Sequence, residues 1–372
     1  MARKFGKKVE IDLNILRYNL GIIGEAGIGK STVAKEICEK LVGEDGYISL
    51  NIGKEDGHGA IAGIISADIP DWATFKDFID DVVENRDTDY KDLKVVIIDT
   101  LDQLFELAEA ETIRQYNKTA EVKARTINQS WGGFGRGLDY TIKLVLDALW
   151  ELKDVGVSFF VIAHVKRTDV ADIMSEEQYT VLTSNITQKY FNAVKQKLDL
   201  LGVAYIDREI VKEKTKKKDA NGNYVEKGKI AAESRVISFR DDTYSLDSKS
   251  RFANITPKIP LDADAFIKAV QDAILAEQSK EGISLEEAQR RQKIKDAEKE
   301  KAALEAAESV KHNRADVDRN VELISIVKEK FPNATDEIKA SVKQIMSEYG
   351  ISNFKDTAVS TEGLEKIVDL LK

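Results

Sequence analysis

Nine residues near the start of the chain have the types and spacing needed to hold a polyphosphate: Gly24-Glu25-Ala26-Gly27-Ile28-Gly29-Lys30-Ser31-Thr32. The pattern is G-x-x-x-x-G-K-S, in which glycines let the backbone curl so that successive N–H groups point at phosphate oxygens. Lys30 is expected to reach the β- and γ-phosphates, and the Ser31 hydroxyl is expected to ligate Mg²⁺. The pattern therefore predicts a site for a nucleoside triphosphate with magnesium.

The residues on either side of this loop predict the elements that position it. An apolar run, 20–23, precedes the loop, and apolar residues with helical spacing follow it at Val33, Ile37 and Leu41. A strand before and a helix after are the context that a phosphate loop requires, and the positive end of the helix dipole favours an anion. The alternative is a chance glycine-rich turn, which leaves the flanking strand and helix unexplained.

A second acidic site lies at the end of an apolar strand predicted over 93–100. A run of β-branched residues such as Val95-Val96-Ile97-Ile98 is typical of a strand buried on both faces of a parallel sheet. It delivers Asp99 to the edge of the sheet beside the phosphate loop, where a carboxylate holds Mg²⁺, usually through water. The alternative is an ordinary turn aspartate after a buried strand.

Composition limits the classes of function. The chain has 372 residues, 42% of them hydrophobic and 33% charged, and a net charge of −9. Any nucleic-acid contact must therefore use a local basic patch rather than the overall field. No apolar run approaches the roughly 20 residues of a membrane helix, and the basic start lacks an apolar segment behind it. The single cysteine, Cys38, is expected in the core, and the expected compartment is the cytoplasm.

Strand and helix patterns alternate along the first three quarters of the chain, which predicts an α/β fold with a mostly parallel sheet and a ligand at the carboxyl ends of its strands. Asn221-Gly222 predicts the turn of a β-hairpin. Residues 276–315 contain nine acids and nine bases with alanine as the main apolar residue. We therefore expect a core over 1–275, a charged helical linker over 276–315 and a small helical domain over 316–372, with a coiled coil as the alternative for the linker.

Four stretches together resemble the phage-encoded RecA-like P-loop ATPases, a family that includes single-strand annealing recombination proteins. They are the phosphate loop, the strand 95–100, the strand 160–164 and the stretch 235–240. The resemblance covers roughly residues 15–275 and implies a RecA-like P-loop NTPase core that uses ATP and Mg²⁺. It also implies assembly into a ring or filament, with single-stranded DNA as the partner. The last hundred residues lie outside it.

The resemblance also indicates which residue activates the attacking water and which residue senses the γ-phosphate. AAA+ proteins usually place a catalytic glutamate directly after the strand-end aspartate, but here Asp99 is followed by Thr100. RecA-like proteins carry it just past the strand that follows the phosphate-loop helix, which makes Glu55 the candidate base, with Asp56 behind it. His164 ends a buried strand where RecA-like folds carry a polar residue that senses the γ-phosphate. The alternatives are a solvated acidic loop for Glu55 and a core histidine for His164.

The DNA contacts that the resemblance implies fall in two loops and one hairpin. The loop candidates are Trp131 and Phe134 for base stacking and Arg136, Lys166 and Arg167 for phosphates. The hairpin candidates are basic residues near its tip, Lys216, Lys217 and Lys218. The alternatives are an interhelical loop with a core tryptophan and a solvated hairpin tip.

RecA-like assemblies complete the site with a basic residue from a neighbouring subunit. Arg235 and Arg240 are the candidates here, and strand-surface roles are the alternative. The expected function is a DNA-dependent ATPase of recombination or replication. A helicase or helicase loader is the second hypothesis, and a nucleotide-switched binding module without significant catalysis is the third. In each case the C-terminal helices are candidates to recruit another replication or recombination protein.

Overall fold

A computed structural model describes residues 6, 9–55, 57–171, 177–218, 224–240 and 245–371, and the side chains of 214–218 and 224–227 are outside that description. The strands are β1 Leu20–Gly24, β2 Tyr47–Ile52, β3 Ser66–Ile69, β4 Val95–Asp99, β5 Ser158–Ala171, β6 Gln178–Ser184, β7 Leu200–Lys218, β8 Tyr224–Ser238, β9 Lys249–Ser250 and β10 Lys258–Pro260. The helices are α1 Lys30–Val42, α2 Trp72–Glu84, α3 Leu101–Thr119, α4 Arg136–Asp154, α5 Gln188–Lys197, α6 Ala263–Gln278, α7 Leu285–Lys330, α8 Asp336–Glu348 and α9 Thr361–Leu370. Short 3₁₀ turns include η3 His58–Ala60 and η4 Ile127–Gly132.

The strands of the described residues form one sheet in the order β10-β8-β7-β1-β5-β4-β2-β3, with β6 paired to β5 and β9 to β7. The run from β7 to β3 is parallel, whereas β8 and β10 are antiparallel to their neighbours. Strand β5 lies between β1 and β4, so the strand before the phosphate loop and the strand that ends in Asp99 are not neighbours. The predicted α/β fold with a mostly parallel sheet and C-terminal helices is confirmed.

Helices cover both faces of the sheet, because each parallel strand is apolar on both sides. Side chains of α2, α3, α4 and α5 pack with one face, and those of α1 and α6 pack with the other. Helix α2 begins where Asp71 accepts a hydrogen bond from the Thr74 backbone N–H, 2.8 Å away, and it buries Phe75 and Ile79. Cys38 is buried with the second face, as expected, and burial raises the pKa of its thiol.

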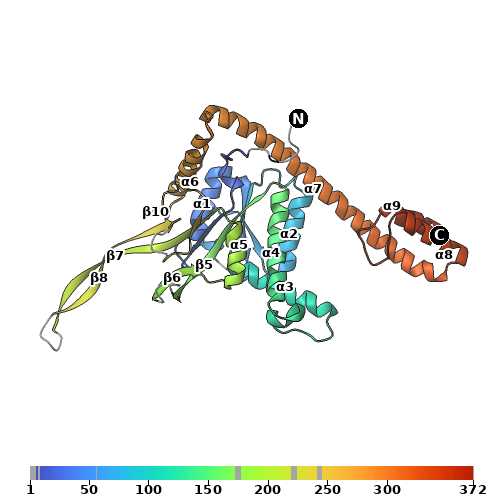
Figure 1. The fold of residues 1–372 in the computed structure, drawn as a ribbon, viewed down its shortest axis with the longest axis horizontal. Helices are drawn as coiled ribbons and strands as arrows, with labels where there is room; N and C mark the ends of the chain where they lie inside the picture. Colours follow the sequence, from blue (N-terminus) through green and yellow to red (C-terminus); the bar gives the residue numbers. More distant parts are fainter. Residues whose placement is uncertain are drawn as a thin grey trace.

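Three projections extend from the carboxyl ends of the parallel strands (Figure 1). Strand β5 continues past its pairing with β1 and forms an antiparallel ribbon with β6. Strand β7 continues in the same way and forms a longer ribbon with β8, which is the predicted β-hairpin. Helices α3 and α4, with η4, form the third projection. The predicted hairpin turn at Asn221-Gly222 lies outside the described residues.

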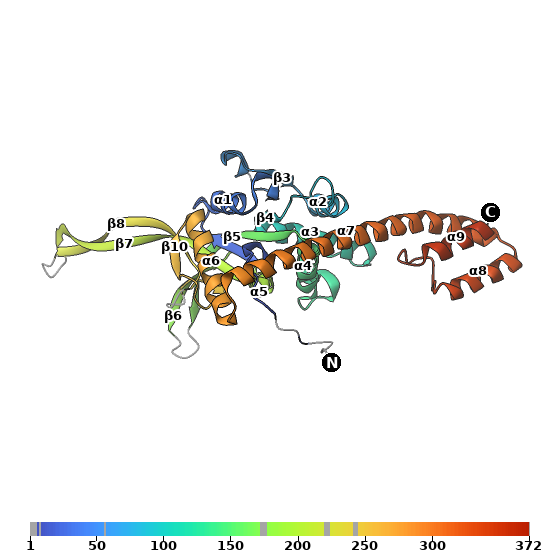
Figure 2. The same cartoon turned by 90° about the horizontal axis from the view of Figure 1, so that it is seen from above.

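Helix α7 runs along the opposite edge of the sheet and carries the C-terminal helices away from the body (Figures 1 and 2). It is 46 residues long and is capped by Ser284, whose side chain accepts a hydrogen bond from the Glu287 backbone N–H. Its last turns pack with α8 and α9 around a small core of their own. The expected boundary between linker and helical domain at 315/316 therefore falls inside one continuous helix.

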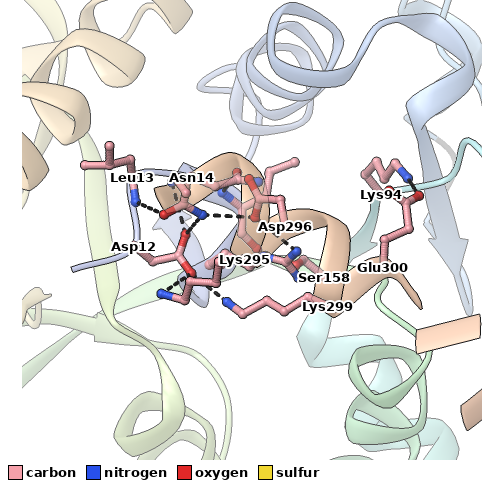
Figure 3. A network of polar contacts seen from close by, with 12 residues as sticks. Asp12, Leu13, Asn14, Lys94, Ser158, Lys295, Asp296, Lys299 and Glu300 are labelled. Atoms are coloured by element: carbon pink, nitrogen blue, oxygen red, sulfur yellow. Dashed lines mark hydrogen bonds and ion pairs between the residues drawn. The ribbon is translucent and has the colours of Figure 1, made fainter. Parts of the chain in front are cut away.

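Ion pairs and small side chains fix the first half of α7 against the body. Lys299 and Lys295 lie 2.6 and 3.3 Å from one oxygen of Asp12, and Lys94 lies 2.7 Å from Glu300 (Figure 3). Burial opposes ionisation of Asp12, but the hydrogen bond and charge of Lys299 and the charge of Lys295 outweigh it and lower the pKa of Asp12. Ala303 is buried against Gly156. The segment expected as a charged helical linker is thus helical, and one side of it packs against the body while most of its charged side chains stay exposed.

A search of the helices within the described part of the chain finds none with the length and apolar character needed to span a bilayer.

Candidate nucleotide-binding site

The phosphate loop connects β1 to α1 and has the backbone that its glycines allow. Gly27 and Gly29 have φ of +74° and +110°, values that a residue with a Cβ rarely adopts. Gly24 is needed for a different reason, since a Cβ there would lie 2.7 Å from the carbonyl oxygen of Ala204 on the adjacent strand. Gly29 also caps α1 and has no side chain that could occupy the N–H groups of the first turn. Those groups are therefore available to an anion.

Lys30 is a buried cation whose hydrogen bonds go to neutral groups. Its side chain is only 5% exposed, and its Nζ donates to the carbonyl oxygens of Gly24 and Glu25 at 3.1 and 3.0 Å. Burial lowers the pKa of Lys30, and the charges of Asp99 and Asp102 oppose that shift. A buried ammonium held only by dipoles gains much from a nearby anion, which fits a polyphosphate in the loop.

The strand register brings the predicted residues to one edge of the sheet. Gly24 on β1 pairs with His164 on β5, and Asp99 on β4 pairs with Asn51 near the end of β2, three residues before Lys54-Glu55. A cavity of about 340 Å³ opens at this edge. Its lining includes the predicted Ala26, Gly27, Gly29, Lys30, Ser31, Thr32, Glu55, Asp99 and His164, together with Gly57, His58, Ala60, Ile61 and Thr100.

Two oxygen donors of this cavity suit magnesium. Ser31 lies in the first turn of α1 and Asp99 is the last residue of β4. A hydroxyl and a carboxylate are hard oxygen ligands, which Mg²⁺ prefers. Asp99 is 5% exposed and is engaged by a histidine that the motifs did not single out. The His58 Nε2 lies 3.1 Å from Asp99 Oδ2, and His58 Nδ1 lies 2.6 Å from the Ser66 hydroxyl. The chemistry of the donors therefore fits the ion.

Glu55 and His164 meet across the strand that separates them. Glu55 Oε1 lies 4.0 Å from His164 Nδ1, and the Thr100 hydroxyl lies 3.5 Å from the same oxygen of Glu55. Thr100 occupies the position where AAA+ proteins usually carry their glutamate, and here its hydroxyl contacts the carboxylate supplied by the neighbouring strand. Asp56, the reserve candidate, lies outside the described residues.

Asp102 is a second acid beside His164. Its Oδ2 accepts a hydrogen bond of 2.9 Å from the His164 backbone N–H and lies 3.8 Å from the imidazole Nδ1. Burial raises the pKa of Asp102, although that hydrogen bond and the charges of His164 and Lys30 oppose the shift. The histidine thus lies between two carboxylates, Glu55 and Asp102.

The predicted basic loop residues Lys166 and Arg167 are exposed on the β5–β6 ribbon, two and three residues after His164. Arg167 extends to within 4.0 Å of the Glu25 carboxylate in the phosphate loop. Strand β5 therefore runs without a break from the nucleotide cavity to two exposed cations.

The two aromatic residues predicted to stack on DNA bases, both in the loop between α3 and α4, have different surroundings. Trp131 stacks on Tyr140, with ring centroids 4.1 Å apart, and its Nε1 donates to the Thr112 carbonyl at 3.3 Å. This packing favours the alternative of a core tryptophan over a base-stacking role. Phe134, in contrast, is fully exposed and has a φ of +49°, and Arg136 nearby is exposed as well.

The two candidate arginines differ in how their own chain holds them. Arg235 is exposed and lies beside the phosphate loop, where its Nη1 donates to the Ile28 carbonyl at 3.4 Å. Arg240 donates to the carbonyls of Ala253 and Phe252 at 3.0 and 3.1 Å, which anchors a loop of the core. The side chains of the hairpin candidates, Lys216, Lys217 and Lys218, lie outside the described residues.

Sequence reasoning missed His58 and Asp102. Both contacts depend on which strands are neighbours, because His58 follows β2 and contacts the end of β4, whereas Asp102 follows β4 and contacts the end of β5. The available signal was positional: each residue lies within six residues of a predicted strand end at the ligand edge.

The chain was compared with curated proteins and with models of protein families. A search of the curated proteins found no match. Residues 17–252, which are more than half of the chain, match the model of a family described as AAA domain. The matched segment contains the phosphate loop, Asp99, Glu55 and His164. The chain therefore belongs to this AAA-domain family and has a P-loop NTPase core.

Proposed function

We propose that this protein is an ATP hydrolase of the RecA-like class that binds single-stranded DNA in recombination or replication. The observation that carries the proposal is the meeting of Lys30, Asp99, Glu55 and His164 in one cavity, from which the β5–β6 ribbon leads directly to exposed basic residues. Two features support the RecA-like class: β5, which carries His164 at the ligand edge, lies between β1 and β4, and the candidate base Glu55 follows β2 rather than Asp99.

The residues divide the work of hydrolysis among them. The loop amides and Lys30 would hold the phosphates, and Ser31 and Asp99 would hold Mg²⁺, which supplies charge neutralisation when bound. Glu55 would accept a proton from the attacking water as that water bonds to the γ-phosphorus and ADP leaves. His164 Nδ1 lies 4.0 Å from Glu55 Oε1 and would respond to the γ-phosphate.

The DNA role is supported by the position of exposed cations and an exposed ring. Lys166 and Arg167 would contact backbone phosphates, and Arg136 would do so on the α3–α4 projection. Phe134 presents a whole aromatic face to solvent, which suits stacking on a base. Hydrolysis of the γ-phosphate would be communicated to Lys166 and Arg167 through His164, because all three residues lie on β5.

Assembly of several copies is part of this proposal, with an arginine from one subunit completing the site of the next. Both side chains are exposed, but Arg240 donates to two backbone carbonyls at 3.0 and 3.1 Å, whereas Arg235 donates to one at 3.4 Å, so Arg235 is the better candidate. Mixing inactive Lys30→Ala and Arg235→Ala subunits should then restore hydrolysis. If mixing restored no hydrolysis, Arg235 would act on the phosphate loop of its own chain.

A single buried cysteine is consistent with the cytoplasm, which we propose as the compartment.

The test of the proposal compares ATP hydrolysis with and without single-stranded DNA. Wild-type protein should hydrolyse ATP faster with DNA, and Lys166→Glu/Arg167→Glu should lose DNA affinity and the stimulation while it still binds nucleotide. The matched control is Lys268→Glu/Lys301→Glu, two exposed lysines on α6 and α7, which should behave as wild type. Hydrolysis without any response to DNA would contradict the DNA role. Annealing of complementary strands without directional unwinding would favour recombination over a helicase.

A further inference from the structure

His58 makes contacts that tie the connection after β2 to the candidate metal ligand. It is 7% exposed and begins η3, the turn that follows the Glu55 loop. Its Nε2 lies 3.1 Å from Asp99 Oδ2 and 3.4 Å from the Ser49 hydroxyl, and its Nδ1 lies 2.6 Å from the Ser66 hydroxyl. Each ring nitrogen of this buried imidazole therefore faces a polar partner.

The partners fix the direction of the hydrogen bonds. An ionised carboxylate can only accept a hydrogen bond, so His58 Nε2 carries a hydrogen and donates a hydrogen bond to Asp99. In the neutral ring, Nδ1 then accepts from the Ser66 hydroxyl, which holds the ring plane and the tautomer. Asp99 is thus oriented through one oxygen by a histidine that is itself oriented by a serine on β3. Outer partners of this kind tune metal ligands in many proteins.

A second contact runs parallel to the first. Glu55, three residues before His58 in the same connection, reaches the Thr100 hydroxyl, which directly follows Asp99. The connection after β2 therefore contacts two successive residues, Asp99 and Thr100. Loss of the His58 contact would remove one partner of the Asp99 carboxylate and leave the segment that carries Glu55 with only its contact to Thr100.

We propose that His58 is a positioning residue of the magnesium site: it orients the Asp99 carboxylate and keeps Glu55 in register with it. This inference rests on the proposed function, because it takes Asp99 as a magnesium ligand. A merely structural histidine makes a different prediction. Its loss would weaken the fold or nucleotide binding equally with and without magnesium, whereas loss of a positioning residue changes the magnesium requirement.

The experiment titrates Mg²⁺ into protein with a fluorescent, non-hydrolysable ATP analogue and repeats the binding in EDTA. His58→Ala should raise the Mg²⁺ concentration at half-maximal binding by about tenfold or more, the usual effect of removing an outer partner. Binding in EDTA should stay near wild type. His58→Gln, which can still present an N–H, should recover part of the effect. The control is His312→Ala, an exposed histidine on α7.

The following results would contradict the proposed role of His58. A magnesium midpoint that is unchanged in His58→Ala would overturn the inference and leave the proposed function standing. If His58→Ala does not fold by circular dichroism, Ser66→Ala takes its place, since it keeps the ring and removes the hydroxyl that orients it. Its midpoint should rise less but in the same direction, and an unchanged midpoint there would overturn the inference equally. A wild-type protein that binds no nucleotide with Mg²⁺ would contradict both proposals.

Discussion

Glu55 and His164 face each other with 4.0 Å between Oε1 and Nδ1, although the strand that carries Asp99 lies between the strands that deliver them. The contact is possible because Glu55 follows the end of β2 and His164 lies where β5 leaves its pairing with β1, so both side chains reach the same edge of the sheet, where Glu55 also contacts Thr100. A carboxylate that could activate water and a group that could report the γ-phosphate are therefore in direct reach of each other.

Glu55→Gln should abolish most hydrolysis and spare binding. The amide keeps the size of the side chain and a contact with Thr100, but it cannot accept a proton from water. Steady-state hydrolysis should fall by about 10²–10⁴-fold, the range that a general base contributes, and the affinity for Mg²⁺–ATP should change little. Glu44→Gln, on the opposite edge of the sheet, is the control. Hydrolysis within a few-fold of wild type would assign the base to another residue.

Asp102→Asn should stabilise the fold more at neutral pH than in acid. Burial raises the pKa of Asp102 above its unfolded value, while His164 and Lys30 oppose that rise. The folded state therefore binds the proton more tightly, and the stability linked to that proton is complete at low pH and is lost as pH rises through the folded pKa. The amide does not titrate, so the gain over wild type in the free energy of unfolding should grow from about pH 4 upward.

Urea unfolding at several pH values measures this gain. The exposed Asp45→Asn controls for the general effect of removing one negative charge. A gain that stays flat or shrinks as pH rises would show that ionised Asp102 carries no desolvation cost in the folded protein.

Gly156→Ala should destabilise the packing of α7 on the sheet. Gly156 has a φ of +81°, and a Cβ there would lie 2.8 Å from the Cβ of Ala303. Gly282→Ala is the matched control, because its φ is +74° but a Cβ there would meet nothing within 4 Å. The control should lose about 1–2 kcal/mol from backbone strain alone. Gly156→Ala should lose more, and an equal loss in urea unfolding would contradict the close approach of α7.

The sequence was informative where spacing along the chain determines a site. The phosphate loop and Asp99 each lie within a local pattern of strand, turn and helix. Glu55 lies just past a strand that could be recognised, and His164 lies at the end of the apolar part of another. Such positions converge because parallel strands bring their carboxyl ends to one edge.

Sequence reasoning failed where a contact depends on neighbours far along the chain. The contact of His58 with Asp99 requires the pairing of β2 with β4. The stacking of Trp131 on Tyr140 likewise depends on how α4 packs, which the local sequence does not give. Alanines and alternating charges on α7 suit a solvated helix as well as a packed one, so Ala303 gave no sign of its burial.

The most direct measurement of the central claim is the affinity of the protein for Mg²⁺–ATP, compared between wild type and Lys30→Ala. Lys40→Ala, on the same helix and paired with Asp264 at the surface, is the control. We expect wild type and Lys40→Ala to bind alike and Lys30→Ala to lose most of its affinity while it stays folded. Equal binding by Lys30→Ala, or no binding by wild type, would contradict the claim that this loop holds the triphosphate.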